Sequence, residues 1–204
     1  MKTRSRAAFT LIEMLLVIAI IGVLGAMLYP VLSKVRESGR VVKCASNLRQ
    51  LQLAVVNYGT VPQATNYWSG DPGRYVLVTG WVGWKSPLPT APTAGAYDWR
   101  GDAGQSCISN GVLWGYVKSL DIYVCPSHKV AAKTYDISRS YSMFVNASGQ
   151  GFVGMSGSPN TILFGDDRNA GSSPYNVGFV TNNVATWHTG KGNVVFLDGH
   201  IERR

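Results

Sequence analysis

The sequence lacks the short motifs that mark the common enzyme classes. Its 204 residues contain no nucleophile elbow, no phosphate loop and no paired-carboxylate motif. It also has no run of basic residues interleaved with stacking aromatics, which is the pattern of many nucleic-acid-binding surfaces. We therefore do not expect an enzyme, and nucleic acid is not an expected partner.

Acidic residues are also scarce, with 11 Asp and Glu against 19 Lys and Arg, for a formal charge of +8. Three of the basic residues, Lys2, Arg4 and Arg6, precede a long apolar run, so loss of residues 1–8 would leave +8 − 3 = +5. That remaining charge is too diffuse to indicate a partner. The apolar fraction of 46% is enough for one core, and we expect one globular unit besides the N-terminal segment.

The apolar run FTLIEMLLVIAIIGVLGAMLYPVL, residues 9–32, contains a single charge, Glu13. From Met14 to Leu32 there are 19 uncharged residues, which as a helix span roughly 28 Å, enough to cross a membrane. The run is longer than a secretory signal core, and the small residues Ala7 and Ala8 precede it instead of following it. Because a carboxylate in a membrane helix costs roughly 2.5–3.5 kcal/mol, we expect Glu13 to be functional. The alternative is that it snorkels to the membrane interface.

The N-terminal stretch MKTRSRAAFTLIEMLLVIAIIGVLGAML resembles the start of a type IV prepilin or type II secretion pseudopilin. The resemblance implies that residues 1–8 are a leader, which a prepilin peptidase removes between Ala8 and Phe9 before methylating the Phe9 amine. The family usually has Gly before the cut, so Ala8 departs from its pattern. The N-terminus would be cytoplasmic in a protein that crosses the inner membrane once. The protein would then enter a periplasmic or cell-surface filament.

The same resemblance gives Glu13 and Pro30 specific roles. In such filaments the glutamate faces the N-terminal amine of a neighbouring subunit, so that its buried charge is paired and helps to set the register of assembly. Pro30 removes a backbone donor and should kink the helix near Ala26. The family also implies that the segment from Gly22 to Pro30 can lose helical order in the filament. A simple bend in a membrane helix is the alternative.

After Pro30 the pattern becomes amphipathic and ends at Gly59 and Pro62. Apolar residues recur at helical intervals of three and four, at Val41, Cys44, Leu48, Leu51, Val55 and Tyr58. We predict one helix over residues 9–58, whose distal half packs on a head formed by residues 59–204. The domain order is therefore a leader, a transmembrane and filament-core helix, and a globular pilin-like head.

The head is predicted to be α+β, with an antiparallel sheet. The segments RSYSMFV (139–145), TILFG (161–165) and NVVFLDGHIE (193–202) have strand patterns and do not alternate regularly with helices. Residues 110–120 suit a short helix, and IYVC (122–125) an extended segment stopped by Pro126. Residues 59–104 are rich in Gly, Pro and aromatics, with a strand-like piece at 75–78, and are predicted to be an irregular insertion.

The C-terminal segment HTGKGNVVFLDGHIE resembles the mark of the prepilin-type H-X9-DG family, with His188, nine residues, then Asp198 and Gly199. The stretches CASNLRQLQLAVVNYG and YVCPS also resemble parts of that family. The resemblance implies an exported, pilin-like protein and assigns no biochemical role to the signature. Asp-Gly between two strand patterns predicts a type I′ hairpin turn. A hydrogen bond between His188 and Asp198 is an open alternative.

Three cysteines allow three single disulfides. Cys44 lies on the helical stripe and is predicted to be a small buried hydrophobe. An oxidising compartment beyond the inner membrane would permit a bond, and Cys107 with Cys125 is the preferred pair.

No cofactor is expected, although several residues are of metal-binding types. Zinc or hydrolytic chemistry could use the set Cys125, His128, His188, Asp198 and His200, but only the first two have a tight ligand-like spacing. Adjacent Asp166 and Asp167 offer oxygen ligands, and calcium is kept as an alternative. The weak metal candidates are thus Asp166, Asp167, His188 and Asp198. A metal-dependent enzyme would require the three histidines to converge.

We expect a structural subunit of a type IV pilus-like or type II secretion pseudopilus-like filament. Its partners would be the prepilin peptidase, like or related pilin subunits and, before assembly, the inner membrane. The main alternative is a minor subunit whose aromatic-rich head adheres to polysaccharide or DNA, which would need an exposed aromatic and basic groove.

Overall fold

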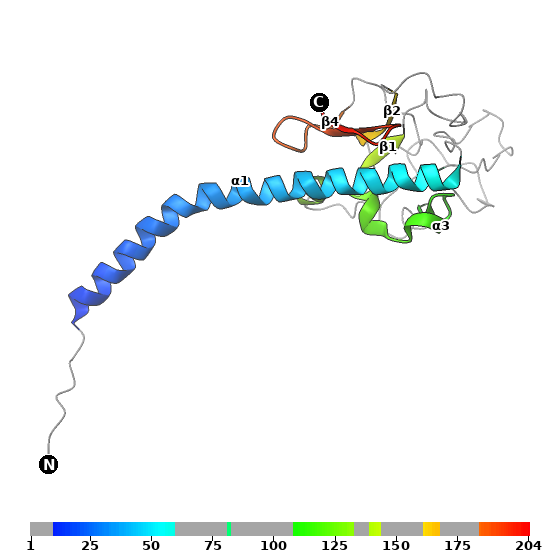
Figure 1. The fold of residues 1–204 in the computed structure, drawn as a ribbon. Helices are drawn as coiled ribbons and strands as arrows, with labels where there is room; N and C mark the ends of the chain where they lie inside the picture. Colours follow the sequence, from blue (N-terminus) through cyan, green and yellow to red (C-terminus); the bar gives the residue numbers. More distant parts are fainter. Residues whose placement is uncertain (1–9, 60–80, 83–107, 133–138, 144–160, 168–183) are drawn as a thin grey trace, which may run out of the picture. The chain divides into compact units, whose positions relative to one another are not determined.

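The structure is a computed structural model and describes residues 10–59, 81–82, 108–132, 139–143, 161–167 and 184–204. Its helices are α1 (Leu11–Tyr58), α3 (Trp114–Val117), the 3₁₀ helix η1 (Leu120–Tyr123) and α4 (Pro126–Ala131). Its strands are β1 (Tyr141–Met143), β2 (Ile162–Asp166), β3 (Asn193–Phe196) and β4 (Ile201–Arg203) (Figure 1). A long apolar N-terminal helix with a small antiparallel sheet confirms the predicted α+β, pilin-like fold. The chain divides into two compact units, Met1–Gly39 and Arg40–Arg204.

In the first unit, the described residues belong almost entirely to the N-terminal part of α1. Its large apolar side chains from Leu11 to Val35 are exposed. By length and composition α1 can cross a membrane, and its most apolar window has none of its residues buried. Pro30 lies inside the continuous helix. The segment from Gly22 to Pro30 is helical in this structure, and both the kink and the loss of helical order in a filament stay predictions.

In the second unit, α1 buries one face. Its buried residues recur at helical spacing and are Cys44, Asn47, Leu48, Leu51, Gln52, Ala54 and Val55. The predicted stripe is confirmed, with Val41 and Tyr58 only partly buried at its ends. The helix stops where predicted. Gly59 takes a left-handed φ of +86°, and its N–H donates to the Val55 carbonyl at 3.2 Å.

The four strands form one antiparallel sheet in the order β1-β2-β3-β4. Tyr141 pairs with Asp166 across β1 and β2, and Val194 pairs with Glu202 across β3 and β4. Every residue of the first three strands is buried, whereas β4 lies at an edge and is largely exposed. The described parts of the predicted segments 139–145, 161–165 and 193–202 therefore contain strands, and the third forms a hairpin, whereas the strand-like piece at 75–78 lies outside the described residues.

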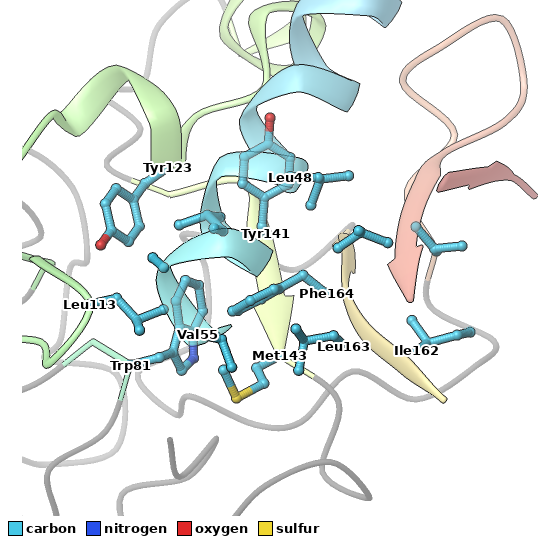
Figure 2. Close-up of a cluster of buried hydrophobic side chains, with 14 of the residues drawn as sticks. Leu48, Val55, Trp81, Leu113, Tyr123, Tyr141, Met143, Ile162, Leu163 and Phe164 are labelled. Atoms are coloured by element: carbon cyan, nitrogen blue, oxygen red, sulfur yellow. The ribbon is translucent and has the colours of Figure 1, made fainter. Parts of the chain in front are cut away.

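The core joins the α1 stripe to the sheet. Leu48 and Val55 from α1 lie among side chains of β1 and β2 (Figure 2). Trp81 stacks on Tyr123, with ring centroids 6.0 Å apart, and meets the Phe164 ring edge-on at 5.0 Å. Large aromatic rings bury the most apolar area per residue, so this group contributes strongly to the stability of the head.

Two local predictions need correction. The helix expected over 110–120 is limited to α3, and the segment before Pro126 is only partly extended because η1 occupies Leu120–Tyr123. The extended backbone at Val124 and Cys125 does end at Pro126, which starts α4. Proline suits this first helical position because its fixed φ is already helical and its missing N–H would have no partner there. The predicted insertion, apart from residues 59 and 81–82, lies outside the described residues.

The β3–β4 turn also differs from the expected type I′. Of its two central candidates only Gly199 has positive φ, at +90°, whereas type I′ requires positive φ at Asp198 as well. The Gly199 N–H donates to the Phe196 carbonyl at 3.0 Å, and the Phe196 N–H to the His200 carbonyl at 3.0 Å. This is the pattern of a longer hairpin loop with a left-handed glycine at its end. The predicted hairpin is therefore confirmed, but the predicted type I′ turn is wrong.

Candidate functional site

At its N-terminus, α1 is capped by a capping box formed by Thr10 and Glu13. Glu13 Oε2 accepts hydrogen bonds from the Thr10 N–H at 2.8 Å and the Thr10 hydroxyl at 2.7 Å. In return, Thr10 Oγ1 accepts from the Glu13 N–H at 3.3 Å. Such a reciprocal pair satisfies donors that would otherwise lack partners in the first helical turn. Glu13 thus has a role within its own subunit, while Ala8 and Phe9 lie outside the described residues.

The helix beyond this cap presents exposed apolar side chains, including Leu16, Ile20 and Leu24. An apolar helix surface of this length is stable only against lipid or against other apolar helices. The capped helix therefore has the length and the apolar surface needed for insertion into a membrane and for packing against other apolar helices.

A second candidate site is a buried cluster of Cys44, Cys125, Asp166 and His188. Cys44 lies on α1, Cys125 immediately precedes α4, Asp166 ends β2, and His188 lies in the segment before β3. All four are fully buried. One ligand-type atom from each lies within 4.8 Å of the other three. Four distant parts of the sequence thus place metal-ligating groups at one point in the head.

The individual distances show how tightly the cluster is packed. Cys44 Sγ lies 3.5 Å from both carboxylate oxygens of Asp166. Cys125 Sγ lies 3.3 Å from His188 Nε2, which in turn lies 3.6 Å from Asp166 Oδ2. The backbone N–H of Asn193 donates to Asp166 Oδ2 at 2.7 Å and fixes the carboxylate.

The cluster redistributes charge among its members. A hydrogen bond from Cys44, together with His188 and a backbone hydrogen bond from His128, lowers the pKa of Cys125 to about 5 despite its burial. Burial, and then the nearby Cys125, raise the pKa of Asp166 to about 7. Burial also raises the pKa of Cys44, and so does its hydrogen bond to Cys125. Of the two thiols in the cluster, Cys125 therefore ionises more readily.

The structure separates the two ends of the His188 to Gly199 signature. His188 joins the cluster, whereas the Asp198 carboxylate bonds to the backbone N–H of His200 at 3.0 Å and to its imidazole. Gly199 packs on α1, where its carbonyl accepts from Arg49 Nη1 at 3.2 Å. The alternative of a hydrogen bond between His188 and Asp198 is therefore wrong.

The remaining candidates have other partners. Asp167 accepts a hydrogen bond from the Ser142 hydroxyl. His128 Nδ1 lies 2.9 Å from Ser140 Oγ, and its ring stacks on Trp187. Among the described residues, neither His128 nor His200 enters the ligand cluster, so the three histidines do not converge as a metal-dependent enzyme would require.

The preferred disulfide cannot be located, because Cys107 lies outside the described residues. Cys125 carries a free, buried thiol beside the free thiol of Cys44. The pairing of Cys107 with Cys125 stays a prediction. The position of Cys44 on the hydrophobic stripe did not predict that its thiol lies beside that of Cys125.

The N-terminal residues match a known family model. The family model described as the prokaryotic N-terminal methylation motif matches residues 3–29. No curated protein and no solved structure matches the chain. The match supports a type IV pilin-like or pseudopilin-like precursor. The motif and the apolar helix fit a membrane-anchored precursor, and the motif implies processing by a prepilin peptidase and assembly with other pilin subunits.

Proposed function

We propose that the chain is a structural, non-enzymatic subunit of a type IV pilus-like or type II secretion pseudopilus-like filament. The observation that carries this proposal is the methylation motif at residues 3–29, which leads directly into the exposed apolar surface of α1. The helix would anchor the precursor in the inner membrane, and it would later form the filament core by packing with the same helix of other subunits.

In this proposal the peptidase cuts between Ala8 and Phe9 on the cytoplasmic side and methylates Phe9. Glu13 then pairs with the amine of Phe9 in a neighbouring subunit. Both hydrogen bonds from Thr10 go to Oε2 of Glu13, so Oε1 can accept from that amine while the cap is kept. The head would face the periplasm or the cell surface.

The capping box makes a sharper test possible, because glutamine can replace glutamate in the box without its charge. Glu13→Gln should keep the helix cap and still assemble poorly, since breaking a buried ion pair costs about 3–5 kcal/mol, or more than a hundredfold in an equilibrium. Glu13→Ala should lose both cap and charge. Thr10→Ala is the matched control, which weakens the cap by about 0.5–2 kcal/mol and leaves the charge.

The measurement is purification of sheared filaments followed by mass analysis of the subunit N-terminus. Wild-type protein should begin at a methylated Phe9 and be present in the polymer, and both Glu13 variants should be processed but depleted from filaments. Normal incorporation of Glu13→Gln would contradict the charge pairing. A mature protein that retains residues 1–8 would contradict the processing.

No observation on the described residues favours the alternative of a surface-binding head. Of the described aromatics in the head, Trp81, Tyr123 and Tyr141 are fully buried in the core, while Tyr116 is half exposed.

A further inference from the structure

We propose that Cys44, Cys125, Asp166 and His188 form a structural zinc site in the head. The proposal rests on the positions of these four side chains and is independent of filament assembly. Nothing in the N-terminal motif bears on it, because all four ligands lie beyond residues 3–29.

Three of the six distances between the ligand atoms match those of a tetrahedral metal, and all six are within 4.8 Å. With bonds of about 2.3 Å to sulfur and about 2.0–2.1 Å to nitrogen or oxygen, tetrahedral zinc holds its ligand atoms roughly 3.3–3.8 Å apart. The sulfur–oxygen distance of 3.5 Å between Cys44 and Asp166 lies in that range. So do the 3.3 Å between Cys125 Sγ and His188 Nε2 and the 3.6 Å between His188 Nε2 and Asp166 Oδ2.

The donor set selects the metal class. Two thiolates and an imidazole suit zinc and do not suit calcium or magnesium, which take oxygen ligands. Asp166 is therefore assigned to a zinc site, while Asp167, its partner in the calcium alternative, bonds to Ser142. All four ligands are fully buried, which leaves no solvent-facing position for a reacting water. A closed site of this kind is structural.

The contacts around the ligands support the same assignment. The Asn193 N–H bonds to Asp166, and Arg203 Nη2 donates to the His188 carbonyl at 2.7 Å. Hydrogen bonds of this kind orient the ligands of metal sites.

The consequence would be a cross-link between α1 and the sheet. Cys44 and Asp166 are 122 positions apart in the sequence, and Cys125 and His188 are 63 apart. One metal ion bound to all four would join the distal part of α1, the start of α4, the end of β2 and the segment before β3.

A disulfide of Cys125, either with Cys44 or with Cys107 as predicted from the sequence, is the competing chemistry and cannot coexist with the zinc site. Disulfide formation takes two electrons and two protons from the thiols to an external oxidant, and it removes one or both sulfur ligands as thiolates. The experiment therefore uses full-length protein extracted in non-denaturing detergent, with free thiols alkylated at lysis in one half of the sample. Non-reducing peptide mapping of that half reports the disulfide.

The other half is desalted after exposure to Zn²⁺ and its metal content is measured. We expect one zinc ion per chain, with an X-ray absorption spectrum showing two sulfur and two nitrogen or oxygen ligands. Co²⁺ in place of zinc should give a thiolate charge-transfer band and tetrahedral d–d bands. No stoichiometric metal, a coordination shell without sulfur, or a disulfide of Cys125 with Cys44 or with Cys107 in the alkylated sample would each overturn the proposal.

Matched variants test the individual ligands. Asp166→Asn and His188→Gln should each lower zinc affinity by more than the 10- to 100-fold typical of outer-shell changes. Asp198→Asn and His200→Gln change the same residue types outside the cluster and should leave the affinity unchanged. Equal losses in both pairs would refute the ligand assignment. Should a cluster variant not fold, the wild-type absorption spectrum still decides the question.

Discussion

The turn at Gly199 provides a direct test of how the C-terminal hairpin docks on α1. A Cβ atom at this position would lie 3.3 Å from Gln52 Oε1, and φ is +90°. Gln52 Nε2 donates to the Leu197 carbonyl at 3.0 Å, and Arg49 Nη1 to the Gly199 carbonyl at 3.2 Å. The substitution Gly199→Ala therefore disturbs both the backbone of the turn and its contact with the helix.

The expected cost has two parts. A left-handed φ at a residue with a Cβ costs roughly 1–2 kcal/mol. Displacing the Gln52 amide weakens a hydrogen bond whose net worth is about 0.5–1.5 kcal/mol. We expect Gly199→Ala to lower the free energy of unfolding by about 1.5–2.5 kcal/mol, the sum of these two parts at their lower and middle values.

Gly190→Ala is the matched control. Its φ is +85°, but a Cβ there would meet no atom within 4 Å, so only the backbone part should appear. Unfolding of full-length protein in detergent by urea, followed by tryptophan fluorescence, measures both variants against wild type. Equal losses for the two variants would refute the docking argument. In a Gln52→Ala background the excess cost at Gly199 should disappear.

Two further predictions concern the core, measured as thermal unfolding of the same full-length protein. Gly111→Ala should destabilise by at least about 1–3 kcal/mol because its Cβ would lie 2.2 Å from the Trp81 carbonyl oxygen; Gly115→Ala, with open space, should be neutral or stabilising. Unchanged unfolding of the Gly111 variant would show that this close packing is absent. Leu48→Ala removes a fully buried side chain and should cost about 2–5 kcal/mol, whereas Leu53→Ala, at 48% exposure, should cost clearly less.

Periodic and local features of the sequence predicted most of the described fold. The intervals of three and four along α1 identified its buried face, and strand-like runs separated from one another in the sequence located β1 to β4. Thr10 was missed as a functional residue, although the Thr-x-x-Glu spacing before an apolar run is the signature of a capping box. The signal is present in the sequence, but Glu13 was interpreted there only as a charge in a membrane helix.

The buried cluster could not be predicted in the same way. Its four ligands come from four separate segments, and none of their intervals is a metal-binding spacing. Cys44 fits the helical stripe as a hydrophobe, and only tertiary packing brings it to Asp166. His188 and Gly199 share a signature yet contact different parts of the head. The spacing of the signature is set by β3 and its turn, and it does not imply that its two ends meet.

The contacts of the hairpin with α1 also set the order of events when the chain folds. Arg49 and Gly199 are 150 positions apart, and Gln52 and Leu197 are 145 apart. At a synthesis rate of about 5–20 residues per second, roughly 7–30 s pass before a ribosome that has made the helix reaches its docking partner. During that interval the apolar face of α1 has no hairpin to cover it, and closure of so long a loop is slow. The nascent protein therefore stays open to proteases and to wrong partners until the hairpin has been made.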